Sequence, residues 1–413
     1  MSGAPPDRAD PDAPAQGAGP LAGLRVIEMG QLLAGPFCGQ LLGDLGAEVI
    51  KLEPPGTGDP MRQWGREKPH GKSLWWPVIA RNKKSVTCNL RTGQGQALAR
   101  QLVDHADIAV ENFRPGTLER WGLGYEELSA TNPGLVLVRV TGFGQTGPYA
   151  PRAGYGSIGE AMGGLRYVTG DADRPPSRSG ISIGDSLAGT FAALGAVSAI
   201  HARSGTGRGQ VVDAAIYEAV LAMMESLVTE WQVAGYQRER SGPVLPNVAP
   251  SNVYPTADGQ TVLVAANQDT VFRRLAALMG RPDLAEDAQW GTHAARGAHQ
   301  EDLDALIAAW TAKHDADALL QLLHDGGVPA GRIFRAADML RDPHFRARES
   351  IVSVTDAQLG ELAMHNVVPR LSGTPGSVRW AGPALGEHNA EVYGGLLDLD
   401  EPARAALREA GSI

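Results

Sequence analysis

The sequence predicts an α/β fold, with a Rossmann-like large domain followed by a small α+β domain. Three observations support this prediction. Apolar runs of strand length alternate with amphipathic helical stretches over the first third of the chain. A polar, proline-rich stretch at residues 238–256 then separates these elements from a second group. With 413 residues, 43% of them hydrophobic, the chain is long enough for a large core and for two or three domains.

The strands expected in the large domain are short apolar runs, each bounded by turn-forming or polar residues. They cover residues 24–30, 48–53, 85–90, 107–113 and 134–143. Helical periodicity between them predicts helices over 36–46 and 95–106. Strands that alternate with helices in this way favour a parallel sheet covered on both faces.

The second half of the chain has a different pattern. A glycine-rich helical stretch covers 157–203, and residues 211–236 begin as a strand and continue as one long helix. The remaining predicted elements are a strand at 260–266 and helices near 270–279, 300–313, 316–326 and 400–410. We therefore divide the chain into a tail at 1–19, a large α/β domain at 20–205, a linker with the long helix at 206–240, a small domain at 241–330 and a final segment at 331–413.

The composition of the chain indicates which kinds of partner and which cellular compartment to expect. Residues 1–19 contain too few large apolar side chains to fold, which predicts a disordered tail. The tail has no apolar core of a secretory signal, and no apolar run reaches the roughly 18 residues of a membrane span. The net charge of −9 disfavours nucleic acid or an anionic membrane as the main partner. Two cysteines, Cys38 and Cys88, are too few for a disulfide framework, which predicts a reducing, cytoplasmic location.

Two nucleotide-binding motifs are present only in incomplete form, and no metal-binding histidine motif is found. Gly30, Gly35 and Gly39 are spaced G-x4-G-x3-G rather than G-x-G-x-x-G, so we interpret them as packing glycines rather than a dinucleotide site. The stretch "REKPHGKS" at 66–73 lacks the first glycine of a phosphate-binding loop, and its proline removes a backbone donor. The ten histidines include no close ligand pair, so we expect no metal and no permanently bound cofactor.

Asp185 precedes a long apolar run in "SRSGISIGDSLAGTFAALGA". Its default interpretation is a helix N-cap, because aspartate accepts hydrogen bonds from first-turn amides. A second interpretation is a nucleophile, since the helix dipole favours the ionised carboxylate. Gly180 and Gly184 would let a ligand approach it, and Gly189 would keep the helix narrow. The two interpretations are compatible.

From Pro20 to about Tyr393 the chain resembles the class III CoA-transferases, the family of formyl-CoA transferase and carnitine CoA-transferase, to whose superfamily the α-methylacyl-CoA racemases also belong. The resemblance is carried, in chain order, by "PLAGLRVIEMGQLLAGPFCGQLLGDLGAEVIKLEPPGTGD", "NKKSVTCNL", "VENFRPGTLERWGLGYEEL", "VTGFGQTGPY", "GDSLAG", "GTGRGQVVDAAIYEA" and "PALGEH". It implies ring-shaped chains that interlock as a homodimer, with residues 331–413 returning to the large domain.

The resemblance also implies a reaction and a site. Asp185 falls on the family's nucleophile, which attacks an acyl-CoA thioester and passes through an aspartyl-CoA thioester. CoA thioesters are then the substrates, beside a free carboxylic acid. The positions that match the family's CoA-binding residues are Leu33, Ala34, Cys88, Arg91, Asn112, Phe113, Arg114, Arg120 and Tyr155. The arginines suit phosphate groups.

Alternatives within and outside the family remain open. A racemase needs two acid–base groups at the α-carbon. Its histidine is replaced here by Tyr155, a poor proton acceptor near neutral pH, so transfer is favoured. Intramolecular transfer within a dicarboxylyl-CoA and a non-catalytic CoA-binding protein are the other hypotheses.

The acceptor is predicted to be a dicarboxylate of about four to six carbons, with succinyl-CoA as donor. In the family's oxalate-type members a glutamine precedes the "AGP" turn, whereas here the residue is Leu33. Those members also carry a long glycine-rich loop in the small domain, where this chain has only "LPNVAPSNVYPTADG". A second carboxylate needs a cation, and Arg62 and Arg178 are the candidates.

Overall fold

The computed structural model describes residues 19–413, so the predicted tail lies, apart from Gly19, outside the described residues. The chain forms two compact units. The first contains the chain up to Leu165 and the segments Gly180–Ser226 and Ala347–Ile413, and the second contains Arg166–Ser179 and Leu227–Arg346. The second unit thus starts earlier than the small domain that we expected at 241–330, and also takes a segment from before α8.

A six-stranded sheet forms the centre of the first unit, with strand order β3-β2-β1-β4-β5-β6 and parallel pairing throughout. The order reverses between β1 and β4, as in doubly wound folds. Each predicted strand is present with slightly different ends. The strands are β1 (Arg25–Glu28), β2 (Glu48–Glu53), β3 (Lys83–Thr87), β4 (Ile108–Glu111), β5 (Val136–Thr141) and β6 (Val211–Ala215).

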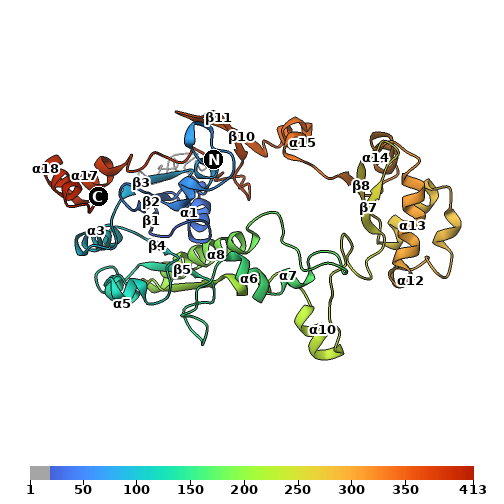
Figure 1. Ribbon diagram of the computed structural model, residues 1–413, viewed down its shortest axis with the longest axis horizontal. Helices are drawn as coiled ribbons and strands as arrows, with labels where there is room; N and C mark the ends of the chain where they lie inside the picture. The colour runs from blue at the N-terminus through green and yellow to red at the C-terminus, as the bar shows by residue number, and fades with distance from the viewer. Residues whose placement is uncertain (1–18) are drawn as a thin grey trace, which may run out of the picture. The chain divides into compact units, whose positions relative to one another are not determined.

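Helices cover both faces of this sheet (Figure 1). One face packs against α1 (Ala34–Asp44), α8 (Ile183–Thr206) and α9 (Ile216–Leu221). The other packs against α3 (Gly93–Asp104), α5 (Tyr125–Thr131), α17 (Asn389–Leu397) and α18 (Glu401–Glu409). The predicted α/β fold with a two-sided parallel sheet is therefore confirmed.

Shorter elements complete the first unit. They are η1 (Pro60–Gln63), η2 (Pro69–Gly71), α2 (Trp76–Ile79), α4 (Thr117–Arg120), α6 (Gly156–Met162) and the hairpin of β10 (Ile351–Asp356) and β11 (Gly360–His365); α7 (Leu165–Val168) crosses the division. A buried ion pair ties the hairpin to the sheet region. Arg81 binds Asp44 of α1 at 2.5 Å and donates to the His365 carbonyl of β11 at 2.6 Å. From Ala347 onward, the final segment is thus part of the first unit, whereas residues 331–346 belong to the second.

The second unit has a three-stranded antiparallel sheet of β7 (Ser251–Pro255), β8 (Thr261–Ala265) and β9 (Ala330–Arg332). Its main helices are α10 (Leu227–Ala234), α11 (Asp269–Leu278), α12 (His293–Ala298), α13 (Gln300–Thr311) and α14 (Ala316–Asp325), with η3 (Pro282–Ala285), α15 (Ala336–Arg341) and α16 (Pro343–Ala347) between or after them. It has an apolar core of its own around Phe272 and Leu303.

The prediction of one long helix within residues 211–236 is wrong. After β6, the chain forms α9, leaves the helical conformation and begins α10 at Leu227. Between the two helices Glu225 has φ +53°, a conformation that a continuous α-helix does not contain, and the break coincides with the change from the first unit to the second. No glycine or proline marks this break, so helical periodicity alone continues through it.

Among residues 19–413, α8 is the one helix that by length and composition could cross a membrane. The sequence predicted no such segment because only uninterrupted apolar runs were considered, whereas α8 includes Ser, Thr and Asp185. A core helix of a soluble protein passes the same test, so this is weak evidence.

Candidate functional site

Two loops meet where the strand order of the sheet reverses. Asn112, which follows β4, accepts a hydrogen bond from the Gln31 amide and donates one to the Gln31 carbonyl, both at 2.8 Å. The loop after β1 is thereby fixed to the loop after β4. The carboxyl edge at such a reversal is the usual ligand position in open α/β sheets. Leu33, Ala34, Asn112 and Phe113, expected to contact CoA, all lie here.

The three glycines of the first βαβ unit do serve packing. A Cβ on Gly30 would lie 2.9 Å from the Asn112 Oδ1 atom, and one on Gly35 would lie 3.3 Å from the Asn112 Cβ atom. At Gly39 a Cβ would lie only 1.9 Å from the Glu28 carboxylate. The glycines thus admit protein groups, not a pyrophosphate, which agrees with their interpretation as packing residues.

A buried cluster of charges lies beneath the loop after β1. Lys51 of β2 binds Glu28 at 2.8 Å and Asp59 at 2.7 Å, while Lys83 of β3 binds Glu28 at 2.7 Å. All four side chains are at most 1% exposed. Burial alone would raise the pKa of Asp59, but Lys51 and the amides of Met61 and Leu32 hold it below its ordinary value. The cluster is therefore paired internally and anchors the loop.

Arg62 has partners within the protein. Its guanidinium donates to both carboxylate oxygens of Glu53 at 2.7 Å and to the Pro383 carbonyl at 3.1 Å, and it stacks on Trp76. This geometry favours a structural role over the predicted role as the cation for a second substrate carboxylate. The other candidate, Arg178, is exposed and belongs to the second unit.

The remaining expected CoA-binding residues differ in accessibility. Cys88 is buried after β3, its sulfur lies 3.3 Å from the Gly95 carbonyl, and burial raises its pKa to about 12. Its thiol is therefore inert, and only its backbone could contact a ligand. Arg91, Arg114 and Arg120 are exposed at the carboxyl edge, as phosphate-binding side chains must be. Their expected role stays a prediction.

Asp185 lies in the first turn of α8, but it is not the N-cap. The cap is Ser182, so Asp185 is the third helical residue, which corrects the default interpretation. A Cβ on Gly156, the first residue of α6, would lie 2.3 Å from the Asp185 Oδ2 atom. The carboxylate therefore lies against the N-terminal residue of α6 as well as in the first turn of its own helix.

Close helix packing brings Asp185 toward the predicted CoA loop. A Cβ on Gly189, one turn after Asp185, would lie 2.7 Å from the Ala34 carbonyl of α1. Residues four apart share a helix face, so Asp185 lies on the side of α8 that approaches Ala34. Tyr155, the N-cap of α6, is 68% exposed beside it.

Two site residues were missed by the sequence reasoning. Glu160 of α6 is 1% exposed and accepts from the Gly184 amide at 3.4 Å, next to Asp185. Gly184 also packs on Glu160, so this glycine serves helix contact rather than ligand approach. Asp59 is the other. For Glu160 the available signal in the sequence was an acid among apolar residues of a predicted helix. For Asp59 it was the acid that ends the turn sequence "PPGTGD".

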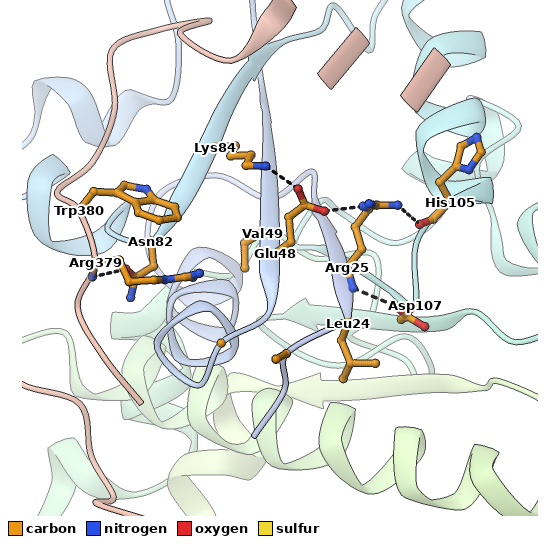
Figure 2. A pocket seen from close by; sticks show the side chains of 13 residues that line it. Leu24, Arg25, Glu48, Val49, Asn82, Lys84, His105, Asp107, Arg379 and Trp380 are labelled. Carbon is orange, nitrogen blue, oxygen red and sulfur yellow. Dashed lines mark hydrogen bonds and ion pairs between the residues drawn. The ribbon is translucent and has the colours of Figure 1, made fainter. Parts of the chain in front are cut away.

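A cavity of about 570 Å³ lies at the opposite, amino-terminal edge of the sheet. Figure 2 shows that Glu48 binds both Arg25 and Lys84 there, and that the Arg25 amide donates to Asp107. It contains none of the predicted site residues. Within residues 19–413, no group of His, Cys, Asp or Glu is suited to hold a metal ion.

Glu111, at the end of β4, holds the backbone beneath Asn112. Its carboxylate accepts from the Phe113 amide at 2.7 Å and from Arg139 at 2.7 Å, and Arg139 also binds Glu119. Burial raises the pKa of Glu111 to about 7, against the opposing effects of Arg139 and the amide. A pH-dependent group thus supports the loop after β4.

Comparison with known proteins gives consistent matches. Residues 21–389 match the profile of CoA-transferase family III. Succinyl-CoA–D-citramalate CoA-transferase of Chloroflexus aurantiacus is 63% identical over 94% of this chain and 97% of its own length. The succinyl-CoA–L-malate CoA-transferase beta subunit of the same organism is 41% identical over 92% and 95%. The crystal structure of a CaiB/BaiF family protein from Brucella suis has a TM-score of 0.81 and 36% identity, covering 92% of this chain and 100% of its own.

We expect Glu111→Gln to remove part of the pH dependence of stability. In the wild type the folded-state pKa is raised from 4.5 to about 7, so the folded state binds the proton more tightly than the unfolded state between these values. The free energy of unfolding should therefore fall as pH rises from about 4.5 to 7. Urea unfolding across this range measures the effect, with the exposed Glu126→Gln as control. An unchanged slope in Glu111→Gln would contradict the assignment.

Proposed function

The chain belongs to the class III CoA-transferases, and from that premise we propose that it moves CoA from succinyl-CoA to a dicarboxylic acid, with citramalate as preferred acceptor. The observation that carries this proposal is the 63% identity, over nearly the whole of both chains, to a transferase named for this pair. A relative named for L-malate supports the same class, because both acids are hydroxylated dicarboxylates. None of the relatives reported above is a racemase, so that alternative gains no support.

We propose Asp185 as the nucleophile. Its carboxylate attacks the succinyl-CoA carbonyl, the C–S bond breaks, and a mixed anhydride and CoA thiolate form. The thiolate attacks the aspartyl carbonyl, which releases succinate and leaves an aspartyl-CoA thioester. The acceptor carboxylate then attacks this thioester, which expels the CoA thiolate and forms a second mixed anhydride. The thiolate attacks the acceptor's acyl carbon in this anhydride, which gives the new acyl-CoA and restores the Asp185 carboxylate. No proton transfer is needed, so an ionised carboxylate without a general base suffices.

The geometry around Asp185 suits these steps. Gly156 leaves one face of the carboxylate without a side chain, since a Cβ there would lie 2.3 Å from an oxygen. The first-turn amides of α6 and α8 are candidates to stabilise the developing oxyanions. Exclusion of water matters, because both the anhydride and the thioester hydrolyse readily.

We also propose that the active protein is the interlocked homodimer that the resemblance implies. The first unit exposes apolar side chains on α6, α8 and α9 and just after α9, among them Ile158, Met162, Leu194, Val197, Leu221 and Met223. Soluble chains seldom expose such a set unless a partner covers it. A second copy of this chain is the proposed partner.

We expect Asp185→Ala to lower kcat by about a thousand-fold or more, because the covalent route is lost. Gly156→Ala should also lower kcat strongly, since its methyl group would occupy the space of the carboxylate. Gly205→Ala in α8 is the control, because a Cβ there meets nothing within 4 Å. Initial rates of citramalyl-CoA formation measure these effects. Retention of a tenth of the wild-type rate by Asp185→Ala would exclude the proposed nucleophile.

Acceptor preference tests the substrate class. With succinyl-CoA as donor, kcat/KM should be highest for citramalate, followed by malate and then unsubstituted dicarboxylates such as glutarate. Matched monocarboxylates such as butyrate should be poorer by about a hundred-fold, because they cannot use a cation for the second carboxylate. Mass spectrometry of the CoA products measures this order. Equal rates for butyrate and citramalate, or a best rate with oxalate, would contradict it.

Dimerisation is tested by dilution. Interlocked rings cannot separate while folded, so sedimentation velocity should give one dimeric species down to nanomolar concentration. A folded monomer at any concentration would rule out the interlocked form.

A further inference from the structure

We propose that Asp59 is a positioning residue for acyl-CoA binding: its carboxylate holds Leu32 in a left-handed backbone conformation and so sets the shape of the loop Gln31–Leu33. This inference rests on the proposed function, because it takes that loop to contact CoA. Asp59 is not among the residues expected to bind substrate, and the transfer chemistry does not require it.

Leu32 has an unusual backbone conformation. Its φ is +66°, a value that side chains other than glycine adopt rarely, because the Cβ approaches the following carbonyl. Its amide donates to both carboxylate oxygens of Asp59, at 3.1 and 3.2 Å. On the preceding peptide, Gln31 is fixed by Asn112. A residue held in an unfavourable conformation by a buried acceptor indicates a loop whose shape is specified.

Asp59 is itself rigidly held. It is 1% exposed, its carboxylate binds Lys51 at 2.7 Å and the Met61 amide at 2.8 Å, and its own amide donates to Glu53 at 2.9 Å. It is thus too deep to touch a ligand, and it acts through Leu32. Leu33, the next residue, is the N-cap of α1 and one of the expected CoA contacts.

The backbone conformation at Leu32 therefore determines the positions of Leu33 and Ala34. A loop held in its bound shape does not have to be ordered when acyl-CoA binds, which favours affinity. Loss of the Asp59 carboxylate should release this loop while Lys51 keeps its second partner, Glu28. The expected defect is in substrate binding more than in the chemical step.

The first test compares two buried acids. Asp59→Asn keeps the size of the side chain but loses its charge and one acceptor oxygen. Asp44→Asn is the matched control, because Asp44 is 2% exposed and pairs with Arg81 at 2.5 Å at the far end of α1. At saturating acceptor, KM for succinyl-CoA should rise about ten-fold in Asp59→Asn, with kcat within about three-fold of wild type. Asp44→Asn should lose stability but keep its KM.

Two further variants are made at Leu32; the first leaves the charge cluster intact and so preserves the test if Asp59→Asn does not fold. Leu32→Val should raise KM in the same way, because a β-branched residue avoids positive φ. Leu32→Gly, placed in the Asp59→Asn background, should recover most of the lost affinity, because glycine adopts positive φ without strain. A merely structural defect would not be rescued by this change.

The outcomes separate this inference from the proposed function. If the wild type transfers CoA but KM is unchanged in Leu32→Val and in folded Asp59→Asn, the positioning role is wrong and the function stands. A rise in KM of Asp44→Asn equal to that of Asp59→Asn would also overturn it. If the wild type transfers CoA to no acid, the proposed function itself fails.

Discussion

The arrangement at the carboxyl edge depends on a carboxylate shared between two buried lysines. Glu28, at the end of β1, binds Lys51 and Lys83 from the next two strands, and Lys51 also holds Asp59. Buried charges are costly unless they are paired, and removal of one partner typically costs about 3–5 kcal/mol. The cluster therefore fixes β1, β2 and β3 and the segment around Asp59 as one rigid support. Gly39 makes room for it, because any Cβ there would meet the Glu28 carboxylate.

The proposed site follows from that support. The loop after β1 is held from below by Asp59 and from the side by Asn112, while α8 reaches α1 closely because Gly189 has no side chain. Asp185 and the expected CoA contacts at Leu33 and Ala34 then lie on approaching faces of α8 and α1. The site is thus built on the sheet edge and on two helix N-termini, which hold reacting groups more firmly than long loops do.

Local patterns predicted much of this architecture. The six strands of the sheet, the helices α1, α3, α11, α13, α14 and α18, and the packing role of Gly30, Gly35 and Gly39 follow from apolar periodicity and glycine spacing. Family membership was predicted from motifs in chain order, and Asp185 was selected through that resemblance. Asp185 alone has the sequence signature of an N-cap, which the structure gives to Ser182.

Long-range pairing explains what the sequence could not show. Asp59 and Glu160 are unremarkable acids until the fold places them under Leu32 and beside Gly184. Arg62 was expected to meet a substrate carboxylate, yet nine residues back along the chain Glu53 offers a buried partner. The break between α9 and α10 carries no glycine or proline, because it marks a change of unit rather than a local preference.

The central claim is that CoA is carried covalently on Asp185. Its most direct test begins by incubating the protein with succinyl-CoA and no acceptor, and then removing unbound succinyl-CoA and CoA. The protein is treated with hydroxylamine, and the modified residue is identified by peptide mass spectrometry. We expect a hydroxamate on Asp185 that is absent without succinyl-CoA and absent when citramalate is added before hydroxylamine. Modification of another carboxylate, or none in a protein that turns over, would contradict it.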